Sequence, residues 1–148
     1  MSTVVEPKTG RILAWKDSIP LQYQYTAGVA GEAFLRGLKE GKLTASKCRK
    51  CGDVRIPPRT YCVVCYGRTN VDVELYQSGR IAAISTPRRS PIAFGFVMFE
   101  GVSGGLVHKI LRDGHPKVDD SVRPVFLRRE ERTGSILDLE GFKTTRWK

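Results

Sequence analysis

Two closely spaced cysteine pairs constrain the fold of this chain more than any other feature. Cys48 and Cys51 form the first C-x2-C pair, Cys62 and Cys65 form the second, and together they are the four cysteines of the 148-residue sequence. Each pair can close a tight turn, or knuckle. Two facing knuckles place four thiolates at the corners of a tetrahedron, which is the geometry of a structural zinc site. The spacing therefore predicts a zinc ribbon.

Three other roles for these cysteines have to be weighed, namely two disulfides, a rubredoxin-like iron centre, or four unrelated buried thiols. Residues 1–10 are polar and contain no apolar core of a secretory signal, so we expect a reducing, cytoplasmic compartment in which disulfides are disfavoured. Four thiolates accept iron as well as zinc, so the sequence leaves the metal open between the two. We expect structural Zn²⁺, because closed four-cysteine sites of this spacing mostly hold zinc.

The composition sets the class of protein. A hydrophobic content of 41% with 27% charged residues is that of a soluble globular protein, and no apolar run approaches the length of a membrane span, so we expect no membrane partner. A ribbon of this size buries too little apolar surface to fold without its metal. We therefore expect a small metal-dependent module beside one compact core.

The net charge of +10 raises the possibility of nucleic-acid binding. The positive excess is concentrated in residues 31–70, on and beside the cysteine segment, where bound thiolates would offset part of it. Single-strand binding also requires aromatic platforms among the basic residues. The candidates are Phe94, Phe96 and Phe99, but Phe94 and Phe96 share a face of a strongly apolar strand and fit core packing equally well. A single-stranded nucleic-acid module remains the alternative function, and nucleic acid is the less expected partner.

The chain divides into three predicted parts. Residues 1–42 are an N-terminal arm followed by a helix over 27–40, where apolar residues recur every three or four positions before Gly41 ends the helix. Residues 43–70 are the ribbon, with short strands over 43–47 and 54–56. Residues 71–148 contain alternating strands separated by glycine-bearing turns, followed by a basic tail. The predicted strands cover 71–76, 80–86, 91–100, 106–112, 121–127, 135–140 and 142–147.

This order of elements predicts a mainly β protein in which a helical arm and a rubredoxin-like zinc ribbon precede a five-stranded OB-fold barrel. Residues 101–105, with the sequence Gly-Val-Ser-Gly-Gly, are predicted to form a hairpin connection.

A catalytic site is harder to find in the sequence. His108 lies in an alternating strand and His115 in a turn, and neither has a companion at metal or nucleophile spacing. The metal would occupy every cysteine, which leaves no thiol nucleophile, and no phosphate-binding loop motif is present. We therefore expect no enzymatic activity in this chain. Its exposed bases, Arg88 and Arg89 among them, remain candidates for contact with phosphates.

Several motifs in fixed order resemble the zinc-ribbon/OB-fold family of acyl-CoA-associated proteins. They cover residues 27 to about 128 and include the sequence Ile56-Pro57-Pro58-Arg59 between the cysteine pairs. The Ser78-Gly79 turn follows soon after the second pair, a combination that generic ribbons lack. Residues 1–26 and 129–148 match no pattern of the family, and the glycine-rich connection over 101–105 looks longer than usual.

The resemblance implies a non-catalytic accessory subunit of a thiolase-superfamily enzyme, such as acetoacetyl-CoA thiolase with HMG-CoA synthase. Such a subunit would dock on the enzyme and help to hold or channel CoA thioesters. By this resemblance Arg59, Arg88 and Arg89 would contact the phosphates of CoA or acyl-CoA. Cys48, Cys51, Cys62 and Cys65 would hold the structural zinc ion.

Overall fold

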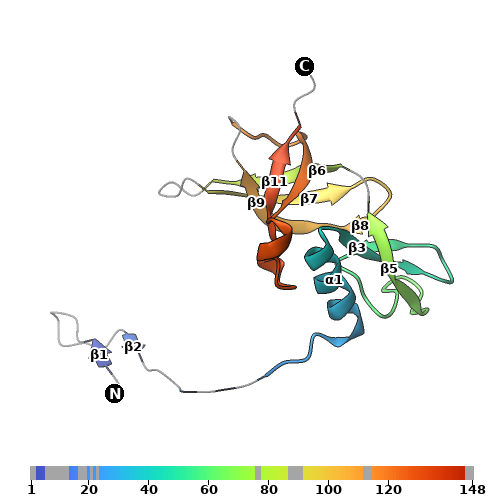
Figure 1. Ribbon diagram of the computed structural model, residues 1–148, viewed down its shortest axis with the longest axis horizontal. Helices are drawn as coiled ribbons and strands as arrows, with labels where there is room; N and C mark the ends of the chain where they lie inside the picture. The colour runs from blue at the N-terminus through green and yellow to red at the C-terminus, as the bar shows by residue number, and fades with distance from the viewer. Residues whose placement is uncertain are drawn as a thin grey trace.

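The computed structural model describes residues 3–5, 14–16, 20, 22, 24–75, 78–86, 92–111 and 115–145. Figure 1 shows a helix and a small sheet packed beside a barrel. Among the described residues, no helix is both long enough and apolar enough to cross a membrane. In chain order the elements are β1 (Thr3–Val5), β2 (Ala14–Lys16), α1 (Gly28–Glu40), β3 (Leu43–Cys48), β4 (Val54–Ile56), β5 (Thr69–Leu75), β6 (Gly79–Ser85), β7 (Ala93–Phe99), β8 (Ser103–Gly104), β9 (Leu106–Leu111), β10 (Ser121–Phe126), the 3₁₀ helices η1 (Arg129–Glu131) and η2 (Ile136–Asp138), and β11 (Leu139–Thr144).

Helix α1 lies close to its predicted position and packs on β3. Its buried face includes Phe34 and Leu38, four residues apart, as the periodicity predicts. Gly41 ends the helix in the left-handed conformation, with φ of 80°, and donates its N–H to the Leu38 carbonyl at 3.0 Å. Thr44 of β3 donates its hydroxyl to the Ala33 carbonyl, so the helix and the strand are joined by a buried hydrogen bond.

A four-stranded sheet in the order β5-β3-β4-β8 forms the ribbon part of the molecule. The sequence pattern assigned residues 71–76 to the barrel. In the structure β5 instead pairs antiparallel with β3, so that Leu75 lies opposite Leu43. The alternation of apolar and polar residues along β5 would suit either sheet, and only the long-range pairing decides between them. The predicted division of the chain into parts at residues 42/43 and 70/71 stays a prediction.

The second half of the chain forms a closed barrel of five strands in the order β10-β11-β9-β7-β6. If the barrel strands are numbered in chain order from β6 to β11, their order around the barrel is 1-2-3-5-4. The third and fifth strands, β9 and β11, pair in parallel. The other neighbours pair antiparallel, and β10 closes the barrel on β6. The fold prediction is thereby confirmed: the protein is mainly β, with one α-helix among its described residues, a ribbon and a five-stranded OB-type barrel.

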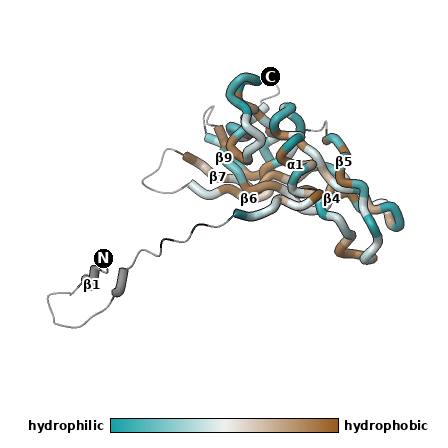
Figure 2. Tube along the Cα trace, turned by 60° about the horizontal axis from the view of Figure 1, so that its bottom comes forward, coloured by the Kyte–Doolittle hydropathy of each residue, from teal (hydrophilic) through white to brown (hydrophobic). Residues whose placement is uncertain are grey.

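One continuous hydrophobic core connects the ribbon sheet with the barrel. It includes Leu38 of α1 and Ile56 of β4, and it continues through Val97 and Phe142 in the barrel. Figure 2 shows the corresponding hydrophobic segments along β6, β7 and β9. The ribbon sheet and the barrel are therefore held to each other by shared burial as well as by chain connectivity.

Two connections differ from the predicted hairpins and strands. After a turn at Gly101, with φ of 67°, the chain forms β8, which pairs in parallel with β4 of the ribbon. The connection over 101–105 thus joins the barrel to the ribbon. Near the C-terminus, the two strands predicted over 135–140 and 142–147 are instead η2 followed by the single strand β11. Buried Asp138 determines this difference, since it accepts backbone N–H groups and closes a turn where the pattern suggested a strand.

Candidate functional site

The structure brings the four cysteine sulfur atoms into one cluster. All four Sγ atoms lie within 4.8 Å of one another, with Cys48 Sγ 3.5 Å from Cys65 Sγ and Cys51 Sγ 3.6 Å from Cys62 Sγ. Four sulfur atoms bound tetrahedrally to zinc at about 2.3 Å would be roughly 3.8 Å apart. The cluster therefore has the size of a closed four-thiolate metal site.

Backbone N–H groups point at the sulfur atoms from within each knuckle. The N–H groups of Lys50 and Cys51 donate to Cys48 Sγ at 3.3 and 3.4 Å, and that of Val64 donates to Cys62 Sγ at 3.3 Å. The hydrogen bond from Cys51 lowers the pKa of Cys48 to about 6, although burial opposes it. At Cys48 these donors stabilise the thiolate, and the thiolate is the form in which cysteine binds a metal.

In each knuckle, a backbone hydrogen bond between residues four positions apart closes the turn. Gly52 donates to the Cys48 carbonyl at 3.1 Å, and Tyr66 donates to the Cys62 carbonyl at 2.9 Å. Gly67 follows directly, and a Cβ built there would lie 3.3 Å from Cys65 Sγ. The absence of a side chain at residue 67 therefore lets the backbone pass close to the sulfur atoms. With soft donors, tetrahedral spacing and an N–H-lined cradle, these residues fit a structural zinc ion, and iron has the same ligand set.

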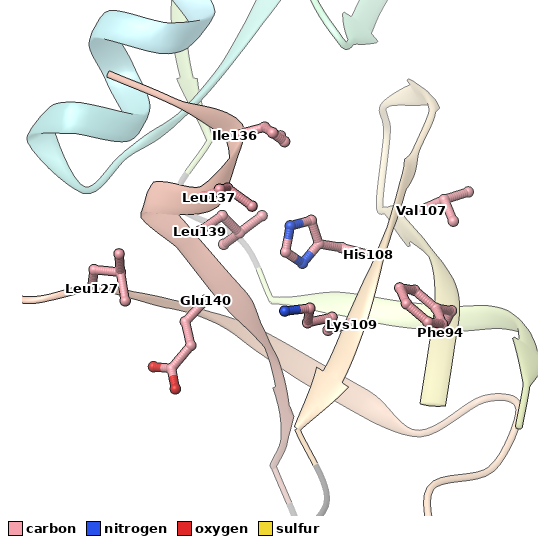
Figure 3. Close-up of a pocket in the computed structure, with 9 residues that line it drawn as sticks. All are labelled: Phe94, Val107, His108, Lys109, Leu127, Ile136, Leu137, Leu139 and Glu140. Atoms are coloured by element: carbon pink, nitrogen blue, oxygen red, sulfur yellow. The ribbon is translucent and has the colours of Figure 1, made fainter. Parts of the chain in front are cut away.

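A second candidate site is an apolar groove on the barrel, with a volume of about 530 Å³ (Figure 3). Its walls come from β7, β9, the start of β11 and the segment that joins β10 to β11. The lining residues are Phe94, Val107, His108, Lys109, Leu127, Ile136, Leu137, Leu139 and Glu140. In OB-folds, oligonucleotides and oligosaccharides bind on the face of the second and third strands and the loops beside it. The groove lies on that face, because β7 and β9 are the second and third strands of the barrel.

His108 forms part of the groove wall, with its ring directed toward Leu137 and Leu139 in Figure 3. The ring packs edge-on against Phe142, at a centroid distance of 6.4 Å. Burial lowers the pKa of His108, the backbone of Ile136 opposes this effect, and the neighbouring charge of Lys109 adds to it. Burial therefore disfavours the charged imidazolium at this position in the groove wall. This agrees with the interpretation of His108 as a packed rather than a catalytic histidine.

The loop beside the groove is shaped by a buried carboxylate. Asp138 is 1% exposed and accepts the backbone N–H groups of Thr133, Gly134 and Ser135 at 3.0, 2.7 and 3.2 Å. Burial raises the pKa of Asp138, but these hydrogen bonds outweigh burial and hold the pKa below its ordinary value. The resulting turn places Ile136 and Leu137, which are 44% and 66% exposed, at the rim of the groove.

The three arginines expected to contact CoA are not brought together by the described structure. Arg59 is exposed on the ribbon, where its N–H donates to Ser46 Oγ at 3.1 Å, and it is not among the residues that line the groove. Arg88 and Arg89 lie outside the described residues. In the sequence they fall between β6 and β7, a few residues before Phe94 of the groove.

No local pattern in the sequence predicts the groove. Its residues come from separate elements and become neighbours only when the barrel closes. One local signal was present for the loop: Ser135 followed three residues later by Asp138 is the spacing of a capping box, and the structure contains that box. The clustering of the four cysteines, in contrast, follows directly from their spacing.

Comparisons with known proteins agree with the ribbon and with the fold. Residues 36–72 match the family model of the ChsH2 rubredoxin-like zinc ribbon domain. No curated protein matches the sequence. Among solved structures, a DUF35 protein of unknown function from Sulfolobus solfataricus is 26% identical. The match covers 83% of this chain and 90% of that one, with a TM-score of 0.65.

A second similar structure is described as an Ltp2–ChsH2(DUF35) aldolase. It is 17% identical and covers 75% of this chain and 91% of the matched chain, with a TM-score of 0.54, a likeness in fold. The chain therefore combines a rubredoxin-like zinc ribbon of the ChsH2 type with the fold of DUF35 proteins, which confirms the predicted resemblance to the zinc-ribbon/OB-fold family.

Proposed function

We propose that this chain is a non-catalytic accessory subunit that docks on a thiolase-superfamily enzyme and holds a CoA thioester in the apolar groove of its barrel. The observation that carries the proposal is the groove itself, which lies on the ligand-binding face of an OB-type barrel. One protein of similar fold is named as part of an aldolase with Ltp2, which supports a role within an enzyme complex.

The lining of the groove suits one end of a CoA thioester. Its volume of about 530 Å³ lies within the usual range for small-molecule sites, roughly 300–1,000 Å³. Val107 is 71% exposed and Leu137 is 66% exposed, so apolar area is available to a ligand. A pantetheine arm and a short acyl chain could cover this area and gain the free energy of apolar burial.

The phosphates of CoA would need cations near the same face. Lys109 lies in the groove wall, and in the sequence Arg88 and Arg89 precede β7, whose Phe94 lines the groove. We propose Arg88 and Arg89 as phosphate contacts. Arg59 is proposed as a phosphate contact only at an interface that the enzyme completes, because it does not line the groove.

We also propose that Cys48, Cys51, Cys62 and Cys65 hold Zn²⁺. When bound, the ion would hold the two knuckles together. Four protein ligands leave no open position for substrate, so the site would be structural.

The nucleic-acid alternative receives less support from the groove. Phe94 is the single aromatic residue among the lining residues, apart from the imidazole of His108, and Lys109 shares the groove with Glu140. Phe99 is buried in the core and is no platform for a base. A single-strand site would require several stacking surfaces along a basic track.

Calorimetric titration of acetyl-CoA into the zinc-loaded chain tests the ligand. We expect saturable binding that weakens at least tenfold in Val107→Asp and in the double variant Arg88→Ala/Arg89→Ala. Val118→Asp is the matched control, because Val118 is also exposed, at 50%, and lies outside the groove. Equal affinity in Val107→Asp and the control would contradict a role for the groove.

Co-expression with a thiolase-superfamily enzyme from the same genome tests the partner. We expect the two chains to elute together in size exclusion and the complex to bind acetyl-CoA more tightly than this chain alone. Separate elution, together with no acetyl-CoA binding, would refute the proposal. Binding of an oligothymidine that falls steeply with salt would instead favour the nucleic-acid alternative.

A further inference from the structure

The second knuckle exposes an unusual amount of apolar surface for a small metal-bound turn. Tyr61 is 53% exposed, Val63 36%, Val64 64% and Tyr66 81%. These four residues lie within one short segment, and we call them the knuckle patch. The knuckle loops lie at the end of the ribbon away from the barrel strands in Figure 1, and Figure 2 shows a hydrophobic loop at that end. None of the four lines the groove.

Tyr66 is held in a backbone conformation that favours glycine. Its φ is 57°, and the equivalent residue of the first knuckle, directly after the second cysteine of the pair, is Gly52 with φ of 77°. A non-glycine residue in this conformation costs roughly 1–2 kcal/mol. Tyr66 offsets little of this cost by burial, since most of its side chain is exposed. Burial within this chain therefore does not account for tyrosine at a position where glycine is favoured.

The surroundings of the patch are basic. Asp53 is the single acidic residue between residues 41 and 71, and it is occupied by Arg55 at 3.3 Å and by the Ser103 hydroxyl at 2.6 Å. The exposed bases around the patch are Arg49, Lys50, Arg59 and Arg68. The backbone hydrogen bond from Arg49 to Arg68 places the two knuckles side by side. Among the described residues no carboxylate lies within ion-pair distance of these four bases.

We infer that the knuckle patch is a docking surface for a partner protein that offers an apolar pocket rimmed by carboxylates. Exposed tyrosines at the centre and arginines at the rim are typical of the residues that dominate protein interfaces. Charge complementarity requires the partner's rim to be acidic, because the rim of the patch is basic throughout.

Two other occupants fit the patch less well. A second copy of this chain would oppose one basic rim to another across a two-fold axis, which is repulsive. Single-stranded nucleic acid would stack on Tyr61 and Tyr66, but Val63 and Val64 between them have no aromatic face for a base. The inference goes beyond the proposed function, because it concerns a surface that contains no groove residue, and it would hold whichever ligand the groove takes.

The test begins with Tyr66→Gly in the zinc-loaded full-length chain. This substitution removes the side chain and relieves the left-handed conformation, so we expect unchanged zinc content and an equal or higher melting temperature. A loss of binding in this variant cannot then be ascribed to unfolding. A random peptide library displayed on phage is selected against the wild-type chain, and the enriched peptides are synthesised and titrated.

We expect enriched peptides in which Asp or Glu flanks aliphatic or aromatic residues. Their affinity should fall at least tenfold in Tyr66→Gly and in Arg49→Glu/Lys50→Glu. The charge control is Lys117→Glu/Arg123→Glu, at exposed positions outside the ribbon, which should bind as the wild type does. Affinity should also decrease with salt.

Each other outcome overturns the inference. An absence of enriched peptides, enriched peptides without acidic residues, or equal affinity in Tyr66→Gly would show that the patch is no docking surface for an acidic partner. Oligothymidine binding that Tyr66→Gly abolishes would assign the patch to nucleic acid. Self-association in sedimentation that Tyr66→Gly abolishes would assign it to a second copy. None of these results bears on acetyl-CoA binding in the groove, so that part of the proposed function can fail or stand separately.

Discussion

Removal of the metal is expected to melt the two knuckles while the barrel stays folded. Leu43, Ala45 and Ile56 of the ribbon strands belong to the shared core, but no side chain between residues 57 and 68 does. Without the metal, the second knuckle retains only a few backbone hydrogen bonds, such as the one from Cys62 to the Gly67 carbonyl. These are too few to offset the chain entropy of the segment.

The size of the effect follows from general magnitudes. Structural zinc contributes an apparent free energy of about 10–16 kcal/mol, which is comparable with or larger than the roughly 5–15 kcal/mol of a whole domain. With zinc bound, exchange of the knuckle amides should therefore require as much opening free energy as exchange of the barrel amides. If the barrel has only about 5 kcal/mol of stability, loss of this protection accelerates exchange of the knuckle amides roughly 10³–10⁴-fold.

Hydrogen exchange before and after chelation measures this effect. The reporting amides are those of Gly52, Cys62 and Tyr66 in the knuckles, compared with the amides of β7 and β9 in the barrel. Cys62→Ser should reproduce the chelated state, and Val64→Ser, at an exposed neighbouring position that is no ligand, should behave as the wild type. Knuckle amides that stay protected without metal, or barrel amides that lose protection equally, would refute the reasoning.

Three further predictions concern stability. Asp138→Ala leaves backbone N–H donors unpaired and should lower the free energy of unfolding, measured with urea, by about 3 kcal/mol. Because the pKa of Asp138 is lowered in the folded state, its stabilising contribution is present above the unfolded pKa, near 3.9, and is lost as pH falls through the folded pKa. Melting temperatures measured across acidic pH should show this loss in the wild type and not in the alanine variant. Gly37→Ala should lower the melting temperature despite the better helix propensity of alanine, because its Cβ would lie 2.8 Å from Thr44 Cγ2 in the contact between α1 and β3. A higher melting temperature would show that Thr44 and β3 move to accommodate the methyl group without loss of stability. Tyr66→Gly should stabilise the zinc-loaded chain by about 1 kcal/mol, and a loss of stability would mean that the tyrosine makes a contact within its own chain.

Local patterns in the sequence predict most of the individual elements. The spacing of the four cysteines predicts their cluster, since each knuckle is closed by residues within its own turn. The periodicity of residues 27–40 and the glycine at 41 predict α1 and its end, and the alternating segments predict β6, β7, β9 and β10 to within a few residues. In each case the determining interactions lie between residues that are close in the chain.

Local sequence patterns do not specify which strands pair with each other. The alternation along β5 is compatible with the barrel or with the ribbon, and its position beside β3 depends on long-range burial of Leu75 against Leu43. The groove depends in the same way on closure of the barrel, which brings Phe94 and Leu137 to one face. The strand predicted over 135–140 failed for a different reason, because the apolar residues Ile136 and Leu137 are exposed on a turn closed by buried Asp138.

We propose that the groove on the second and third barrel strands holds a CoA thioester. An NMR titration of the isotope-labelled, zinc-loaded chain with acetyl-CoA tests it most directly, residue by residue. We expect shifts in the amides of Phe94, Val107, Lys109 and Leu137 that saturate together, with the knuckle amides unchanged. Shifts confined to the ribbon, or an unchanged spectrum both for the chain alone and for its complex with the enzyme, would contradict it.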